Sequence, residues 1–211
     1  MSYELYHAPG SAALGVQVLL EEIGVPYTLI PTTTAMDEPR PAKQLALNPN
    51  GWVPVLVWDE GAMYECAAIT IFLCDRHPKA GLAPAENDPA RALYLQTLVY
   101  FSNAVQTAFQ TSYYPDRFVD TPAQEPSAER RGVRRLTETW GVINDQIGTN
   151  EWVLGNQFSA ADIYLFMLTT WLSPSKDHPP LDQFPNVKRI ARKLMTRPSI
   201  AHVYRGWIEN Q

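Results

Sequence analysis

The pattern of apolar residues changes near residue 80, and this change constrains the fold more than any other feature of the sequence. Before it, short apolar runs at residues 3–7 and 27–30 predict strands, and they flank a helical pattern at residues 16–23. After it, the apolar side chains recur at the three-to-four spacing of helices. The chain is therefore expected to fold as an α/β domain followed by an all-helical one.

Within the first region, the elements predict the order βαβ–α–ββα. A short helix is expected at residues 42–47, strands at about 53–58 and 62–64, and a helix that runs to about residue 77. Asp59-Glu60-Gly61 is a plausible hairpin turn between the last two strands. The first half of this order indicates a parallel crossover, and the second half indicates an antiparallel hairpin.

Proline and glycine residues at 79–89 predict a connection between the two regions. We therefore predict a first domain at residues 1–80, a linker at 81–88 and an all-helical domain at 89–211. Helical patterns in the last of these lie at about 95–109, 133–147, 163–171, 187–194 and 200–207, and a proline-rich irregular connection is expected at 115–126.

Composition excludes several classes of protein. The 211 residues are 45% hydrophobic, enough for a sizeable core, and 17 Lys+Arg against 22 Asp+Glu give a net charge of −5 without the basic surface of a nucleic-acid binder. No window approaches about 18 uninterrupted apolar residues, and the first residues do not have the pattern of a signal peptide. Cys66 and Cys74 are too few for a disulfide framework or a thiolate zinc site. The expected class is a soluble globular protein of the reducing cytoplasm.

Common cofactor motifs are missing from the sequence. It contains neither a phosphate-binding loop, a dinucleotide fingerprint, an HExxH zinc motif nor a Cys-x-x-Cys dithiol, and its four histidines do not have metal-ligand spacing. We therefore expect no metal, and redox chemistry by a pair of protein cysteines is excluded.

Ala8-Pro9-Gly10-Ser11, between a predicted strand and helix, is the first segment that could carry chemistry. Ser11 stands where an N-cap residue would stand, so the plainest interpretation is a capping hydroxyl. The alternative is that this hydroxyl and the helix N-terminus together stabilise an anion brought by a ligand.

Two further segments have both a structural and a functional interpretation. Pro54 either simply begins a strand or follows a cis Val53–Pro54 bond that turns the Val53 N–H and C=O outward, toward an extended peptide-like ligand. Glu65 either favours the start of a helix through the dipole or binds an ammonium group, while the helix N-terminus beside it holds a carboxylate.

In this order and spacing, the three segments resemble the glutathione transferase family, and the resemblance spans nearly the whole chain. It implies a thioredoxin-like first domain in which Val53-Pro54 is the cis-proline loop that pairs with the cysteinyl part of glutathione. Glu65-Cys66 is similar to the acidic residue–serine pair that binds the γ-glutamyl end. Residues 158–163 are similar to the folding signature of the helical domain, and their sequence alone predicts a capping box of Ser159 and Asp162.

The sequence departs from the family pattern at two positions. Cys66 replaces the usual serine, which weakens the side-chain contact but keeps the backbone N–H; a quiet, partly buried cysteine is favoured there over a reactive thiolate. Many bacterial relatives carry a catalytic cysteine where this chain has Ala12 and Ala13. Serine-type members have their serine where Ser11 stands, and Tyr6 is the tyrosine alternative. We favour Ser11.

The resemblance implies a cytoplasmic, homodimeric detoxification enzyme that stabilises the thiolate of glutathione, its co-substrate, and directs it at a small hydrophobic electrophile. Ser11 would be catalytic, and the residues expected to bind glutathione are Tyr6, Trp52, Val53, Pro54, Glu65 and Cys66. Candidate electrophile-site residues, each also compatible with plain core, are Phe109, Tyr113, Trp171 and Trp207.

The same residues are compatible with other functions. The thiolate could serve an isomerase, a lyase or a peroxidase, or the protein could be a non-catalytic binder of glutathione or hydrophobic ligands. No nucleic-acid or membrane partner is expected.

Overall fold

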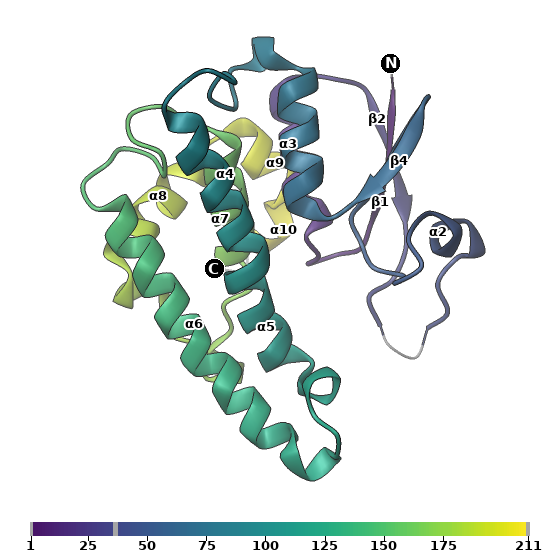
Figure 1. Cartoon of the computed structure of the whole chain (residues 1–211), viewed down its shortest axis with the longest axis vertical. Coiled ribbons are helices and arrows are strands. Elements are labelled where there is room, and N and C mark those ends of the chain that lie inside the picture. The colour runs from purple at the N-terminus through teal and green to yellow at the C-terminus, as the bar shows by residue number, and fades with distance from the viewer. Residues whose placement is uncertain (1, 36–37, 210–211) are drawn as a thin grey trace. The chain divides into compact units, whose positions relative to one another are not determined.

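The structure is a computed structural model that describes residues 2–35 and 38–209, and it divides them into two compact units (Figure 1). The first unit joins the chain up to Arg91 with a C-terminal segment that starts at Met195, and the second runs from Ala92 to Leu194. None of the helices in the described part of the chain is long and apolar enough to cross a membrane.

A four-stranded mixed sheet forms the centre of the first unit, in the order β2-β1-β3-β4. β1 pairs in parallel with β2, and β3 is antiparallel to both of its neighbours, so the predicted crossover and hairpin are confirmed. The strands are β1 (Tyr3–His7), β2 (Tyr27–Pro31), β3 (Val55–Trp58) and β4 (Gly61–Tyr64).

Helices of the first unit follow the predicted order: α1 (Ala13–Ile23), α2 (Ala42–Leu47) and α3 (Cys66–Arg76). α1 ends where Gly24 adopts the left-handed conformation (φ 76°), which glycine tolerates without steric cost. α1 and α3 pack against each other, and apolar side chains of both, among them Leu19, Ile69 and Leu73, are buried. Together with the sheet they make the thioredoxin-like arrangement that the resemblance implies.

β3 begins at Val55, two residues later than expected. Pro54 has no backbone N–H to donate to a neighbouring strand, so the ladder of hydrogen bonds starts after it. Val53 and Pro54 are consequently left outside the sheet, in the loop that precedes β3.

The C-terminal segment belongs to the first unit, which differs from the predicted division of the chain into residues 1–80 and 89–211. α9 (Pro198–Val203) packs on α1, and the Arg197 guanidinium donates to both carboxylate oxygens of Glu22, at 3.0 and 2.6 Å. Ser199 donates to the same carboxylate. The helix expected at residues 200–207 is interrupted at Tyr204 and continues as α10 (Arg205–Ile208).

The second unit is built from helices, as predicted. The helix expected from residue 95 to 109 consists of α4 (Ala90–Tyr100), whose first two residues belong to the first unit, a π-helical turn and α5 (Gln106–Tyr113). α6 (Glu125–Ile147) runs alongside α5 (Figure 1) and includes Pro126 in its first turn, where proline is tolerated. α7 (Ala160–Thr169) and α8 (Pro185–Leu194) complete the unit.

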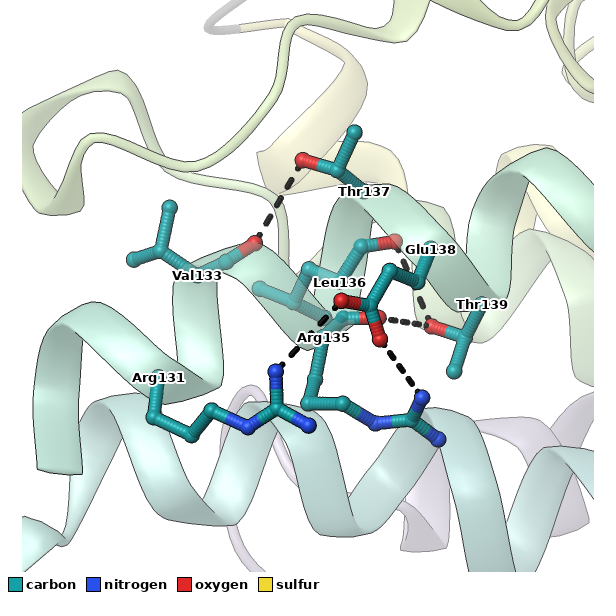
Figure 2. Close-up of polar contacts among 7 residues, drawn as sticks. All are labelled: Arg131, Val133, Arg135, Leu136, Thr137, Glu138 and Thr139. Atoms are coloured by element: carbon teal, nitrogen blue, oxygen red, sulfur yellow. Dashed lines mark hydrogen bonds and ion pairs between the residues drawn. The ribbon is translucent and has the colours of Figure 1, made fainter.

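Several polar side chains in the middle of α6 find their partners within the helix itself, as Figure 2 shows. On the exposed face, Glu138 accepts from Arg131 and Arg135 at 3.4 and 2.6 Å. The buried Thr139 donates to the carbonyl of Arg135 at 2.8 Å and to that of Leu136 at 3.2 Å. Exposed ion pairs contribute little to stability, so the buried apolar face determines where α6 packs.

The capping box at the start of α7 is confirmed. Ser159 Oγ accepts from the N–H of Ala161 at 3.3 Å, and the Asp162 carboxylate accepts from the N–H of Ser159 at 2.9 Å. Asp162 also accepts from the N–H of Val153 at 2.9 Å, and thereby anchors the preceding loop to the helix.

Candidate functional site

The register of the sheet brings the three predicted segments to one edge. Tyr6 pairs with Val55 and Val55 pairs with Tyr64, so the end of β1, the start of β3 and the end of β4 lie side by side. Neighbouring strands are about 4.8 Å apart, so the loops that continue from these positions are close together. They contain Ser11, Val53 and Glu65. The residues that the sequence predicts to bind one ligand are thus gathered at one place in the first unit.

A direct contact also joins two of these segments. The Cys66 thiol, 6% exposed, points to the carbonyl of Ala12 at 3.7 Å, which ties the start of α3 to the start of α1. Burial raises the pKa of Tyr204 well above its ordinary value, and the neighbouring Cys66 raises it further, so the C-terminal segment reaches the same place. The Cys66 side chain is therefore directed into the protein interior, and its backbone N–H lies in the first turn of α3.

In this structure the Ser11 hydroxyl makes hydrogen bonds to the backbone at the start of α1, as its structural interpretation predicts. Its hydroxyl donates to the carbonyl of Ala8 at 2.7 Å and accepts from the N–H of Ala13 at 3.3 Å. The N-cap position itself belongs to Ala12, one residue later than predicted, with φ −62°. The N–H of Ala12 makes no hydrogen bond with any residue that the structure describes. A free donor therefore stands beside the Ser11 hydroxyl at the positive end of α1.

The Val53–Pro54 peptide bond is cis, as predicted. Among the described residues, neither the N–H nor the C=O of Val53 has a hydrogen-bond partner. The loop is held from its other side, where Gln44 donates to the carbonyl of Gly51 at 3.0 Å and Asn48 donates to that of Trp52 at 3.0 Å. This anchoring leaves a donor and an acceptor of one residue available to an extended ligand backbone.

Glu65 has an unusual backbone conformation. Its φ of 76° lies in the left-handed region that non-glycine residues seldom adopt, and its side chain is exposed. Within the described part of the chain its carboxylate forms no ion pair. Such strain is typical of functional positions, and here it places an unpaired carboxylate beside the first-turn N–H groups of α3.

Tyr6 is 2% exposed, and its hydroxyl makes no hydrogen bond with the described residues. His7, on the opposite face of β1, has a buried Nδ1 without a partner in the same part of the chain, and burial lowers the pKa of its imidazole. The Tyr6 hydroxyl, at the end of β1, is thus a further polar group that a ligand at this end of the sheet could bind. Trp52, 45% exposed, lies in the adjoining loop.

Three of the four predicted electrophile-site residues form one aromatic cluster in the second unit. The Phe109 ring is stacked at 6.3 Å from that of Tyr113 and meets Trp171 edge-on at 5.5 Å. The Tyr113 hydroxyl donates to the carbonyl of Trp171 at 2.7 Å. Trp207 belongs to the first unit and lies in α10.

Sequence reasoning missed one member of this cluster. The His178 ring lies edge-on to Phe109 and Tyr113, at 5.6 and 5.1 Å, and its Nε2 is 2.9 Å from the Oγ of Ser112. No motif or spacing connects residues 112 and 178, which are brought together only by the packing of the unit. In the described residues no group of three or more His, Cys, Asp or Glu has the arrangement of a metal site.

Two family models match this chain. Residues 5–83 match the family model of the glutathione S-transferase N-terminal domain, and residues 101–198 match that of its C-terminal domain. The glutathione S-transferase GstA of Escherichia coli O157:H7 is 25% identical over 199 residues, 93% of this chain and 94% of that protein.

Solved structures are similar over almost the full length. A glutathione transferase homologue from Sulfitobacter, with bound glutathione, has a TM-score of 0.88 and 25% identity and covers 98% of both chains. A sphingomonad glutathione S-transferase complexed with glutathione has a TM-score of 0.82 and 25% identity, over 96% of this chain and 98% of that one. With a thioredoxin-like sheet, a helical second unit and matches to both domains, this chain belongs to the glutathione S-transferase family.

Proposed function

We propose that the protein is a glutathione transferase, which binds glutathione at the edge of the sheet in the first unit and directs its thiolate at a hydrophobic electrophile. The observation that carries the proposal is the unpaired N–H and C=O of Val53, between two helix N-termini. Glutathione is an extended tripeptide with a thiol in its middle residue, and its backbone there offers the complementary acceptor and donor.

The γ-glutamyl end of glutathione is a zwitterion, and the start of α3 suits both of its charges. The first-turn N–H groups of α3, including that of Cys66, would hold the carboxylate, and the unpaired Glu65 would hold the ammonium. The strained backbone at Glu65 supports this role, since the surrounding structure maintains a conformation that costs free energy.

The thiol must be activated, because a pKa of about 8.5 leaves only a few per cent thiolate at pH 7. Lowering this pKa by about two units takes about 2.7 kcal/mol. The dipole of α1 supplies only about 0.3–1 kcal/mol, whereas a hydrogen bond to a charged acceptor contributes about 1.5–3 kcal/mol. Direct donors are therefore needed.

Two adjacent donors suit the thiolate. We assign the catalytic side chain to Ser11, whose hydroxyl would turn from the Ala8 carbonyl to the sulfur, and we add the free N–H of Ala12 as a partner that needs no rearrangement. Tyr6, whose hydroxyl makes no hydrogen bond with the described residues, is the alternative side-chain donor. In the second unit, the cluster of Phe109, Tyr113 and Trp171 would bind the electrophile.

A binding and turnover experiment tests this function. The wild-type protein is expected to be retained on a glutathione-affinity column and to conjugate an aromatic electrophile such as chlorodinitrobenzene. A panel with cumene hydroperoxide and an isomerase substrate separates conjugation from the alternative glutathione-dependent reactions. Retention without turnover of any substrate would instead favour a non-catalytic binder, and absence of retention would contradict the proposal.

Glu65→Gln tests the geometry of the site. It keeps the size of the side chain but removes the charge that would pair with the glutathione ammonium, so the KM for glutathione is expected to rise about tenfold, while kcat changes little. Glu60→Gln is the matched control, since Glu60 pairs with Arg76 on the exposed surface of the same unit. Equal KM values for the two variants would remove Glu65 from the site.

The resemblance further implies a cytoplasmic homodimer with a role in detoxification, and these remain proposals. Gel filtration of the purified protein tests the dimer directly.

A further inference from the structure

His178 is buried at the centre of the aromatic cluster, and both of its ring nitrogens have partners. The N–H of Ser173 points to Nδ1 at 3.2 Å, and Ser112 Oγ lies 2.9 Å from Nε2. Because a backbone N–H can only donate, Nδ1 must accept, and the ring proton therefore lies on Nε2 and is donated to Ser112. The imidazole is thus held in one neutral tautomer.

This arrangement is not that of a nucleophile and its general base. A base must accept the serine proton at Nε2, and here Nε2 carries the ring proton. Ser112 is also fully buried, with 0% of its surface exposed, so no substrate atom can reach its hydroxyl. The hydrogen bond between Ser112 and His178 therefore has a structural effect on neighbouring residues and takes no part in breaking or forming a bond of the substrate.

The surroundings are two segments far apart in the sequence. Ser112 and Tyr113 lie on α5, whereas Trp171, Ser173 and His178 lie in the segment that follows α7. Ser112–His178 and Tyr113–Trp171 are two polar ties between these segments, and the rings of Phe109 and His178 fill the space between them. Phe109 and His178 are buried, while Tyr113 and Trp171 are partly exposed, so these last two are the rings that a ligand can touch.

We infer that His178 is a positioning residue: through its bonds to Ser112 and Ser173, it sets the orientation of the Tyr113 and Trp171 rings against which an aromatic ligand binds. The identification of that ligand as the electrophile rests on the proposed function. The polar ties matter because aromatic rings held only by apolar contacts can slide, whereas a hydrogen bond fixes a direction.

Charged groups around the ring are consistent with a neutral His178. Burial lowers the pKa of its imidazole, which the carbonyl of Trp171 opposes. The charge of Lys176 lowers this pKa further. Glu129, which pairs with Lys176 at 3.0 Å, raises it, and so does Asp177. The net direction is downward, so the neutral ring persists at physiological pH.

Ser112→Ala tests the inference, because it removes the acceptor of Nε2–H without adding volume. Binding of anilinonaphthalene sulfonate, followed by fluorescence, is expected to weaken about tenfold, the effect of one lost buried hydrogen bond, while the Kd for glutathione stays unchanged. Trp171→Leu should remove most of the dye signal and so locate the dye at the cluster. Dye binding that is unaffected by Trp171→Leu would contradict the assigned site.

Thr97→Val is the matched control. Thr97 is buried in the same unit and accepts a hydrogen bond from Gln146 at 3.1 Å, so this variant loses one comparable bond away from the cluster. Equal losses of dye affinity in Ser112→Ala and Thr97→Val would mean that general loosening, not positioning, is responsible, and would overturn the inference.

A nitrogen NMR spectrum of the wild-type protein tests the tautomer without any ligand. The inference requires a protonated Nε2 and an unprotonated Nδ1, and the opposite tautomer would overturn it. If Ser112→Ala does not fold, Ser112→Cys keeps a weak acceptor in place and is expected to show a smaller loss of dye affinity. The dye experiment needs no glutathione, so failure of the proposed function, seen as absent glutathione binding, is distinguished from failure of this inference.

Discussion

At the scale of single residues, backbone groups rather than side chains dominate the candidate site. The N–H and C=O of Val53 and the N–H of Ala12 are unpaired among the described residues, whereas the side chains of Ser11 and Cys66 are turned toward the carbonyls of Ala8 and Ala12. Side-chain identity at these positions is therefore less constrained than backbone shape. This would explain how Cys66 can stand where the resemblance to the family leads us to expect serine.

Ala12→Pro tests the backbone donor, because it removes the N–H and the φ of −62° at residue 12 is compatible with proline. The pKa of the bound glutathione thiol is expected to rise by more than one unit, since a free N–H that bonds a thiolate contributes about 1.5–3 kcal/mol. Ser11→Ala should raise it by less than about one unit, because this hydroxyl must give up its bond to Ala8. The pH dependence of thiolate absorbance measures both.

A larger rise of the thiol pKa in Ser11→Ala than in Ala12→Pro would show that the Ser11 hydroxyl, not the Ala12 N–H, is the main donor to the thiolate. Circular dichroism at matched temperatures serves as the folding control for both variants. Tyr6→Phe distinguishes the third candidate donor in the same assay.

At the scale of elements, the close approach of α5 and α6 organises the second unit. A Cβ on Gly132 would lie 2.6 Å from the backbone nitrogen of Ser112 and 3.0 Å from the carbonyl oxygen of Ala108. Backbone atoms cannot move aside as a flexible side chain can, so only glycine allows the two helices this separation. The same approach holds Ser112 in the position where it meets His178.

Gly132→Ala is expected to destabilise the protein even though alanine is the better helix former. Overpacking costs about 1–3 kcal/mol, against a gain of about 1 kcal/mol in helix propensity, so the free energy of unfolding should fall by up to about 2 kcal/mol. Gly141→Ala is the control on the same helix: a Cβ there meets nothing within 4 Å, and stability should rise by about 0.5–1 kcal/mol. Urea denaturation measures both, and a stabilised Gly132→Ala variant would contradict the proposed close contact.

Most elements were predictable, because their signals are local. The helical spacing of Val16, Leu19 and Leu20, the stop at Gly24 and the box of Ser159 with Asp162 each act within a few residues. The errors lie where a neighbouring element intervenes. The N-cap of α1 falls at Ala12 rather than Ser11, and the last helix is interrupted at Tyr204, which packs near Cys66.

At the scale of the whole molecule, the C-terminal segment completes the first unit. Glu22 on α1 binds both Arg197 and Ser199 through its carboxylate, with 12% of the Glu22 side chain and 32% of the Arg197 side chain exposed. Burial by itself would raise the pKa of Glu22, but the hydrogen bonds from Arg197 and Ser199 and the charge of Arg197 outweigh it and lower the pKa. Charge-assisted hydrogen bonds therefore join the end of α1 to the C-terminal segment.

This contact predicts a pH dependence of stability. Since the pKa of Glu22 is lower in the folded state, its stabilising effect is present above the unfolded pKa of about 4.5 and is lost as the pH falls through the folded value. Glu22→Gln should lower the free energy of unfolding by about 2 kcal/mol at pH 7 and flatten its decline below pH 4.5. Urea titrations across this range measure both effects. A variant whose decline with acid equals that of the wild type would show that Glu22 is not the linked group.

The sequence by itself determined most of the secondary structure, the presence of a parallel crossover and an antiparallel hairpin, and the three segments on which the resemblance to the family rests. These follow from side-chain periodicity and hydrogen bonds within single turns, which neighbouring residues specify. Only the tertiary structure decided which polar groups are already bound and which remain open, that Met195 onward returns to the first unit, and that His178 reaches Ser112. The physical reason is that such contacts depend on the packing of whole elements, which no short stretch of sequence encodes.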